Sequence, residues 1–219
     1  QFNMTKDLKK RILTSITLLL LLFFAFMNNY VLGYVLIIIA LFSILEFLGM
    51  TMIILKKYKI RKSFINLVFI FYIFYFCTVF LTLSFSLSLK ILIFIILLTC
   101  VASDIGGFVV GKSFKGPRLT KISPNKTISG AIGSLIFSAT FATLLIYYLT
   151  KNFEPYVIII GLITSVGCQI GDLFFSFLKR KSSLKDTGNF LPGHGGILDR
   201  IDGMLLGIPL GFLTLLTIY

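Results

Sequence analysis

Residues 87–110 read LSLKILIFIILLTCVASDIGGFVV, and only Lys90 and Asp104 in this run carry a charge. A helix of about 20 predominantly apolar residues is long enough to cross the hydrocarbon core of a bilayer. The run therefore predicts a transmembrane helix with a carboxylate near its far end. It decides the fold class because most of the remaining chain repeats this pattern.

Similar apolar windows recur along the whole chain. The windows lie at about 12–28, 30–55, 63–83, 87–110, 128–149, 156–178 and 201–219. With 57% hydrophobic and 13% charged residues and a mean hydropathy of +1.00, the 219 residues hold more apolar surface than one soluble core could bury. We therefore expect an all-α, polytopic integral membrane protein of about seven transmembrane helices. It should form a single integral membrane domain over residues 1–219.

The first apolar window follows a basic tail, as the apolar region of a secretory signal peptide does. It has no clear small-residue cleavage site, and further windows follow it. We expect it to be retained as the first membrane helix.

The basic residues are distributed unevenly between the two sides of the predicted membrane. The N-terminal tail and the connections after the second, fourth and sixth windows hold 19 of the 21 lysines and arginines. By the positive-inside rule these segments face the cytoplasm. We therefore expect a multi-pass membrane protein whose basic loops lie on the cytoplasmic side. The net charge of +13 follows mostly from this asymmetry and does not indicate nucleic-acid binding.

Carboxylates are concentrated in or beside the apolar windows, where an ionised Asp costs about 2.5–3.5 kcal/mol unless it has a partner or a function. Five of the eight acidic residues have this placement: Glu46, Asp104, Asp172, Asp199 and Asp202. The four aspartates fall at the cytoplasmic ends, and the spacing of the last two predicts one face of a starting helix. Glu46 lies near mid-membrane, so we expect it to pair with a polar helix neighbour, at a subunit contact.

Residues 176–202 read SFLKRKSSLKDTGNFLPGHGGILDRID. This run resembles the signature of phosphatidate cytidylyltransferases, integral membrane enzymes that make CDP-diacylglycerol. An ordinary basic loop would explain the lysines, but not the His-Gly-Gly run or the paired aspartates. The matching positions are Ser176, Lys179, Arg180, Lys185, Asp186, Gly188, Pro192, His194, Gly195, Gly196, Asp199, Arg200 and Asp202.

A second block, residues 103–127, carries the other half of the resemblance. It has an Asp-x-Gly-rich helix end at Asp104, a Gly-Lys pair at Gly111, and a Ser-Pro-x-Lys-Thr turn from Ser123 to Thr127. Together the blocks predict a catalytic half at about 100–205. Residues 106–113 also match the P-loop pattern, but a P-loop follows a strand and precedes a helix. Here a membrane span precedes the pattern and Pro117 follows, so we reject the ATPase reading.

The resemblance implies a metal centre in which Asp172 and Asp199 are the ligands and Asp202 supports them. Clustered carboxylates away from cysteines favour Mg²⁺, and a second cation such as K⁺ is a further candidate. The alternative for Asp199 is a helix N-cap. His194 could donate a hydrogen bond or a proton, and a purely structural role in its Gly-rich turn is equally open.

The implied substrates are both polyanions, which the surplus of cations fits. The predicted catalytic residues are Asp172, Asp199, Lys185, His194, Arg200 and Asp202. The predicted substrate-binding residues are Asp104, Lys112, Arg118, Ser123, Lys126, Thr127, Lys179 and Arg180.

The resemblance implies a homodimeric nucleotidyltransferase of the bacterial inner membrane that transfers a cytidylyl group from CTP to phosphatidate in a lipid membrane, releasing pyrophosphate. Its catalytic loops and active site should lie on the cytoplasmic side, with the basic segments. Alternatives are a CTP-dependent transferase for an ether lipid or a polyprenol, and a transporter. A transporter should place polar groups near the midplane and repeat its two halves. In this chain the polar groups gather at one membrane edge and no repeat is visible.

Overall fold

The computed structural model of the chain describes residues 6–120, 123, 126–188, 190 and 195–218. Within these ranges every regular element is a helix, and Arg118 and Thr127 form an isolated antiparallel bridge. The helices are α1 (Lys6–Met27), α2 (Asn29–Ile54), α3 (Lys59–Leu83), α4 (Leu87–Phe114), α5 (Ile128–Thr150), α6 (Tyr156–Lys181), α7 (Leu198–Ile201) and α8 (Met204–Ile218).

The helices have the length and composition of membrane spans. Among the described residues, six spans are long and apolar enough to cross a bilayer, and the segment Ile12–Met27 is a shorter apolar helix. Large apolar side chains such as Tyr30, Ile60 and Phe74 are exposed, as expected for surfaces that face lipid rather than water. The prediction of an all-α polytopic membrane protein is confirmed.

Two helix boundaries differ from the sequence prediction and affect the site. Helix α4 continues to Phe114, so Lys112 is helical rather than part of a loop. All of residues 106–113 lie in this helix, which confirms that they do not form a P-loop. The last apolar span, Leu198–Ile218, is interrupted after α7, and Asp202 lies in the turn before α8. The prediction that Asp199 and Asp202 share one helix face is therefore wrong.

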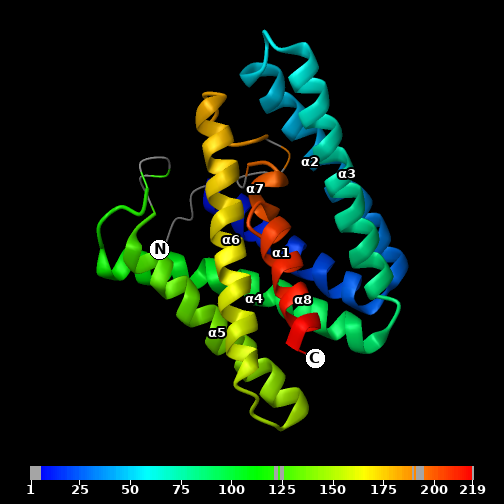
Figure 1. Ribbon diagram of the computed structural model, residues 1–219, viewed down its shortest axis with the longest axis vertical. Helices are drawn as coiled ribbons and strands as arrows, with labels where there is room; N and C mark the ends of the chain where they lie inside the picture. Colours follow the sequence, from blue (N-terminus) through cyan, green and yellow to red (C-terminus); the bar gives the residue numbers. More distant parts are fainter. Residues whose placement is uncertain (1–5, 121–122, 124–125, 189, 191–194, 219) are drawn as a thin grey trace. The chain divides into compact units, whose positions relative to one another are not determined.

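The chain divides into two compact units. Unit 1 comprises Gln1–Ser86 and Leu178–Arg200, and unit 2 comprises Leu87–Phe177 and Ile201–Tyr219. In unit 1, α2 packs against α1 and α3, and Figure 1 shows α2 and α3 side by side. The rings of Phe47 and Phe69 stack with centroids 3.8 Å apart. Near the same end, Thr51 Oγ1 donates a hydrogen bond to Asn66 Oδ1 at 2.7 Å.

In unit 2, α4 packs along α5 (Figure 1). Glycines of both helices lie at this contact. A Cβ atom on Gly106 would lie 2.7 Å from the carbonyl oxygen of Gly133, closer than real Cβ contacts allow. Small residues of this kind let membrane helices approach backbone to backbone. Helix α6 meets the start of α8 in the same way, since a Cβ atom on Gly171 would lie 2.5 Å from the Asp202 carbonyl oxygen.

Candidate active site

A cavity of about 630 Å³ lies in unit 2 between α4, α5, α6 and the segment that links α4 to α5. It brings together residues of the block 103–127 and Asp172 of α6. Five predicted site residues line it: Asp104, Lys112, Lys126, Thr127 and Asp172. Asp172 therefore shares a cavity with predicted residues that lie far from it in sequence.

An ion pair joins the block 103–127 to α6 across this cavity. Lys126 Nζ contacts Asp172 Oδ2, and the two side chains are 27% and 32% exposed. The chain folds back on itself before α5, because Leu119 N–H donates to the Lys126 carbonyl at 2.7 Å and Ile128 N–H donates to that of Pro117 at 2.9 Å. This fold-back places Lys126 over the carboxylate. Both groups remain accessible to a ligand entering the cavity.

Thr127 and Gln169 are two further polar side chains in the cavity wall. Thr127 caps α5, since its Oγ1 accepts a hydrogen bond from Gly130 N–H at 3.1 Å. Gln169 was not predicted from the sequence, although it lies three residues before Asp172 and so shares its face of α6. Its Nε2 donates to the Ala131 carbonyl and to Ser165 Oγ, each at 3.3 Å. That i, i+3 spacing was the signal that could have identified it.

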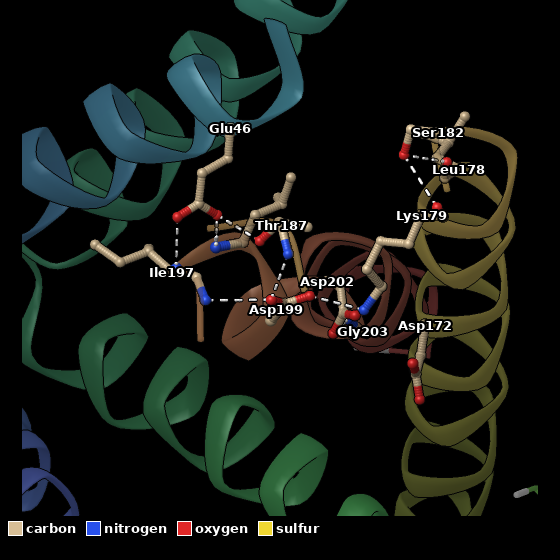
Figure 2. A network of polar contacts seen from close by, with 12 residues as sticks. Glu46, Asp172, Leu178, Lys179, Ser182, Thr187, Ile197, Asp199, Asp202 and Gly203 are labelled. Carbon is tan, nitrogen blue, oxygen red and sulfur yellow. Dashed lines mark hydrogen bonds and ion pairs between the residues drawn. The ribbon is translucent and has the colours of Figure 1, made fainter. Parts of the chain in front are cut away.

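The signature run in unit 1 is organised around Asp199, as Figure 2 shows. Lys179 Nζ donates to Asp199 Oδ1 at 2.7 Å. The backbone N–H groups of Thr187 and Gly196 donate to Asp199 Oδ2 at 2.8 and 3.2 Å. The Asp199 side chain is only 6% exposed, so these contacts compensate for its burial.

Glu46 also contacts this run, a role that the sequence did not indicate. Its carboxylate accepts hydrogen bonds from Thr187 Oγ1, Ile197 N–H and Leu198 N–H (Figure 2). The sequence predicted a polar neighbour on another helix, and the structure instead places Glu46 against Thr187, outside the helices, and two backbone N–H groups of the signature run. Residues 46 and 187 are too far apart in sequence for spacing to reveal the contact.

The remaining predicted residues are placed as follows. Arg118, Arg180, Lys185 and Arg200 are exposed, and Arg118 is not among the described residues that line the cavity. Ser123 belongs to the turn before Lys126, whose N–H it accepts at 3.1 Å. Asp202 is buried, and its Oδ1 accepts a hydrogen bond from Gly203 N–H at 2.9 Å. His194 lies outside the described residues.

The two predicted metal ligands differ in how well they suit a cation. Asp172 offers a partly exposed carboxylate on the cavity wall, which suits a hard cation such as Mg²⁺. Asp199 already accepts three hydrogen bonds, and a carboxylate accepts about four. Within the described part of the chain, no group of three or more His, Cys, Asp or Glu side chains is placed to hold a metal.

Comparison with known proteins gives a consistent result. The chain is 42% identical over 115 residues to a phosphatidate cytidylyltransferase of Mycobacterium leprae (strain TN), covering 52% of this chain and 36% of that protein. It is 40% identical over 128 residues to one of Rickettsia typhi (strain ATCC VR-144 / Wilmington), covering 54% and 56%. It is 45% identical over 112 residues to one of Bacillus subtilis (strain 168), covering 49% and 41%.

These alignments span about half of this chain and between 36% and 56% of each relative. The model of the Cytidylyltransferase family matches residues 1–218, which is almost the whole chain. The cavity residues and the signature run both lie within that match. The chain therefore belongs to the cytidylyltransferase family.

Proposed function

We propose that the protein transfers the cytidylyl group of CTP to phosphatidate, giving CDP-diacylglycerol and pyrophosphate. The observation that carries the proposal is the unit 2 cavity, in which Lys126 of the block 103–127 meets Asp172 of α6. Family membership and the names of the relatives support the same chemistry.

In this proposal the cavity receives the triphosphate. Lys126 and Lys112 line it and supply positive charge, which offsets the repulsion between two anionic substrates. Breaking the pair with Asp172 would free the Lys126 ammonium for a phosphate oxygen. The glycines along α4 and α5 keep the cavity wall free of larger side chains.

The phosphatidate phosphate is already an anion, so its attack on the α-phosphorus of CTP requires no strong side-chain base. The chain's task is to hold the two phosphates within reacting distance and to stabilise the leaving pyrophosphate. Lys185, Arg180 and Arg200 have exposed side chains that suit this task. Lys179 holds Asp199 instead, so we assign it to organising the signature run.

Mg²⁺ is the cofactor that we propose, with Asp172 as its protein ligand in the cavity. Such an ion commonly takes one or two carboxylates, with water and substrate phosphates as the other ligands. When bound, it would neutralise phosphate charge during transfer. K⁺ is proposed as the second cation.

We further propose that the protein is a homodimer of the bacterial inner membrane whose site opens to the cytoplasm. The concentration of basic residues on one predicted side supports this orientation. CTP is a polyanion that does not cross the bilayer unaided, so a cytoplasmic opening agrees with the proposed substrate.

The direct test uses the purified full chain with CTP, phosphatidate and Mg²⁺, and detects CDP-diacylglycerol by mass spectrometry. We expect equimolar CDP-diacylglycerol and pyrophosphate, and none without the divalent cation. A panel of ether-linked phosphatidate and polyprenyl phosphate tests lipid choice. Transfer to one of these lipids but not to phosphatidate would overturn the proposed acceptor, and no transfer to any would overturn the reaction.

A further inference from the structure

The carboxylate of Glu46 contacts three separate points of the signature run, all within unit 1. Its Oε2 accepts from Thr187 Oγ1 at 2.6 Å and from Leu198 N–H at 2.9 Å, and its Oε1 accepts from Ile197 N–H at 3.0 Å. Thus one side chain of α2 joins Thr187 to Ile197 and Leu198. Within the run, Asp199 links Thr187 to Gly196, and Glu46 adds a second link from a separate helix.

A second side chain of α2 contacts the same run. Phe42 lies four residues before Glu46, on the same face of the helix. Its ring packs on that of Phe190 with centroids 3.7 Å apart. The polar and apolar contacts together make this face of α2 a support for the signature run.

Two glycines of the signature run allow the Glu46 carboxylate to lie close to the backbone of that run. A Cβ atom on Gly188 would lie 2.6 Å from Glu46 Oε1. One on Gly196 would lie against Glu46 Oε2 and Thr187 Oγ1. The absence of side chains at both positions is therefore what admits the carboxylate.

The contacts of Glu46 are continuous with those of Asp199. Thr187 donates its hydroxyl to Glu46 and its N–H to Asp199. Of the next three N–H groups, that of Gly196 donates to Asp199, and those of Ile197 and Leu198 donate to Glu46. Displacement of Glu46 would therefore disturb the backbone that fixes Asp199.

We propose that Glu46 is a positioning residue for the cytidylyl transfer, holding the signature run so that its charged side chains are correctly placed. The expected effect of Glu46 on turnover rests on the proposed function. Its expected effect on the order of the signature run does not, so turnover and backbone order can be measured separately.

Glu46→Gln is the sharpest test because it keeps the shape of the side chain. The two carboxylate oxygens each accept a backbone N–H, so an amide must turn its own NH₂ towards one of those donors. Glu154→Gln, in the α5–α6 connection, makes the same chemical change away from the signature run and serves as the control.

Hydrogen–deuterium exchange of the purified full-length protein measures the order of the run. In Glu46→Gln we expect exchange over residues 195–200 to accelerate by roughly 10-fold or more, since hydrogen bonds to a charged acceptor are lost. Exchange in α4 and α5 should not change, and Glu154→Gln should match the wild type. Wild-type exchange in Glu46→Gln would overturn the proposal, whether or not the protein proves to be a cytidylyltransferase.

Kinetics then separate positioning from simple loss of fold. We expect kcat to fall by about 10- to 100-fold, as for other residues that orient a site from outside, with KM for CTP changed less than about threefold. A fall in active protein with unchanged kcat per folded molecule would overturn the proposal. If Glu46→Gln does not accumulate, Thr187→Val removes one of the three hydrogen bonds, and wild-type exchange and kcat in that variant would also overturn it.

Discussion

Lys126 and Asp172 form an ion pair across the unit 2 cavity, although they lie far apart in sequence. Both side chains remain partly exposed, so the pair adds little to stability. Its placement in the cavity suits a site that exchanges an internal partner for a ligand. The proposed role of each residue can be tested on its own.

Asp172→Asn should lower kcat by about 100-fold or more, because it removes the charge proposed to face a cation. The melting temperature in detergent should stay near that of the wild type, since the ion pair is partly exposed. Turnover assays and thermal unfolding of the same preparation check both statements. An active Asp172→Asn protein would contradict the metal-ligand assignment.

Asp199→Asn should lose activity and stability together, unlike Asp172→Asn. The Asp199 carboxylate is 6% exposed and accepts three hydrogen bonds. The amide of the variant would place its own NH₂ donor against at least one of these three donors. We expect a loss of about 1–3 kcal/mol in unfolding free energy. Equal melting temperatures for the two variants would contradict this distinction.

Lys126→Ala should raise KM for CTP by roughly 10-fold or more, with a smaller effect on KM for phosphatidate. Arg118→Ala should change KM for CTP by less than about threefold, because Arg118 is exposed and outside the described cavity lining. Initial rates at varied CTP and phosphatidate provide the measurement. Equal effects of Lys126→Ala on both substrates would contradict a triphosphate role.

Much of the fold followed from local properties of the sequence. Apolar length predicted the membrane helices, and the family resemblance predicted five residues that line the cavity. The break after α7 was not predicted, because the i, i+3 spacing of Asp199 and Asp202 suits one continuous helix and does not reveal the turn at Asp202 and Gly203. Contacts across long sequence separations were also missed. No periodicity links Glu46 to Thr187, and only folding brings α2 to the signature run.

Gly106→Ala should destabilise the contact between α4 and α5 by about 1–3 kcal/mol, since the added methyl group has no room beside Gly133 and Phe137. Gly49→Ala is the matched control, because a methyl group on Gly49 in α2 meets nothing within 4 Å. That control should be neutral or stabilising by up to about 1 kcal/mol. Unfolding in detergent compares the two, and equal stability would contradict the close packing of α4 on α5.

Cysteine labelling should show that the catalytic loops share one side of the membrane. Ser113 at the end of α4 and Ser183 after α6 are exposed, as is Asn152 between α5 and α6. Single cysteines at Ser113 and Ser183, in an active cysteine-free background, should react with an impermeant thiol reagent only from the cytoplasmic side. A cysteine at Asn152 should react only from the opposite side, because one membrane span separates it from each loop.

The same variants test whether nucleotide protects the end of α4. CTP with Mg²⁺ should slow labelling at Ser113, because a bound triphosphate would occupy the cavity that Lys112 lines. Labelling at Asn152 should not change and serves as the internal control. Reaction of Asn152 and Ser183 from the same side would refute the orientation, and with it the expectation that the cytoplasmic ends of the helices carry Asp104, Asp172, Asp199 and Asp202.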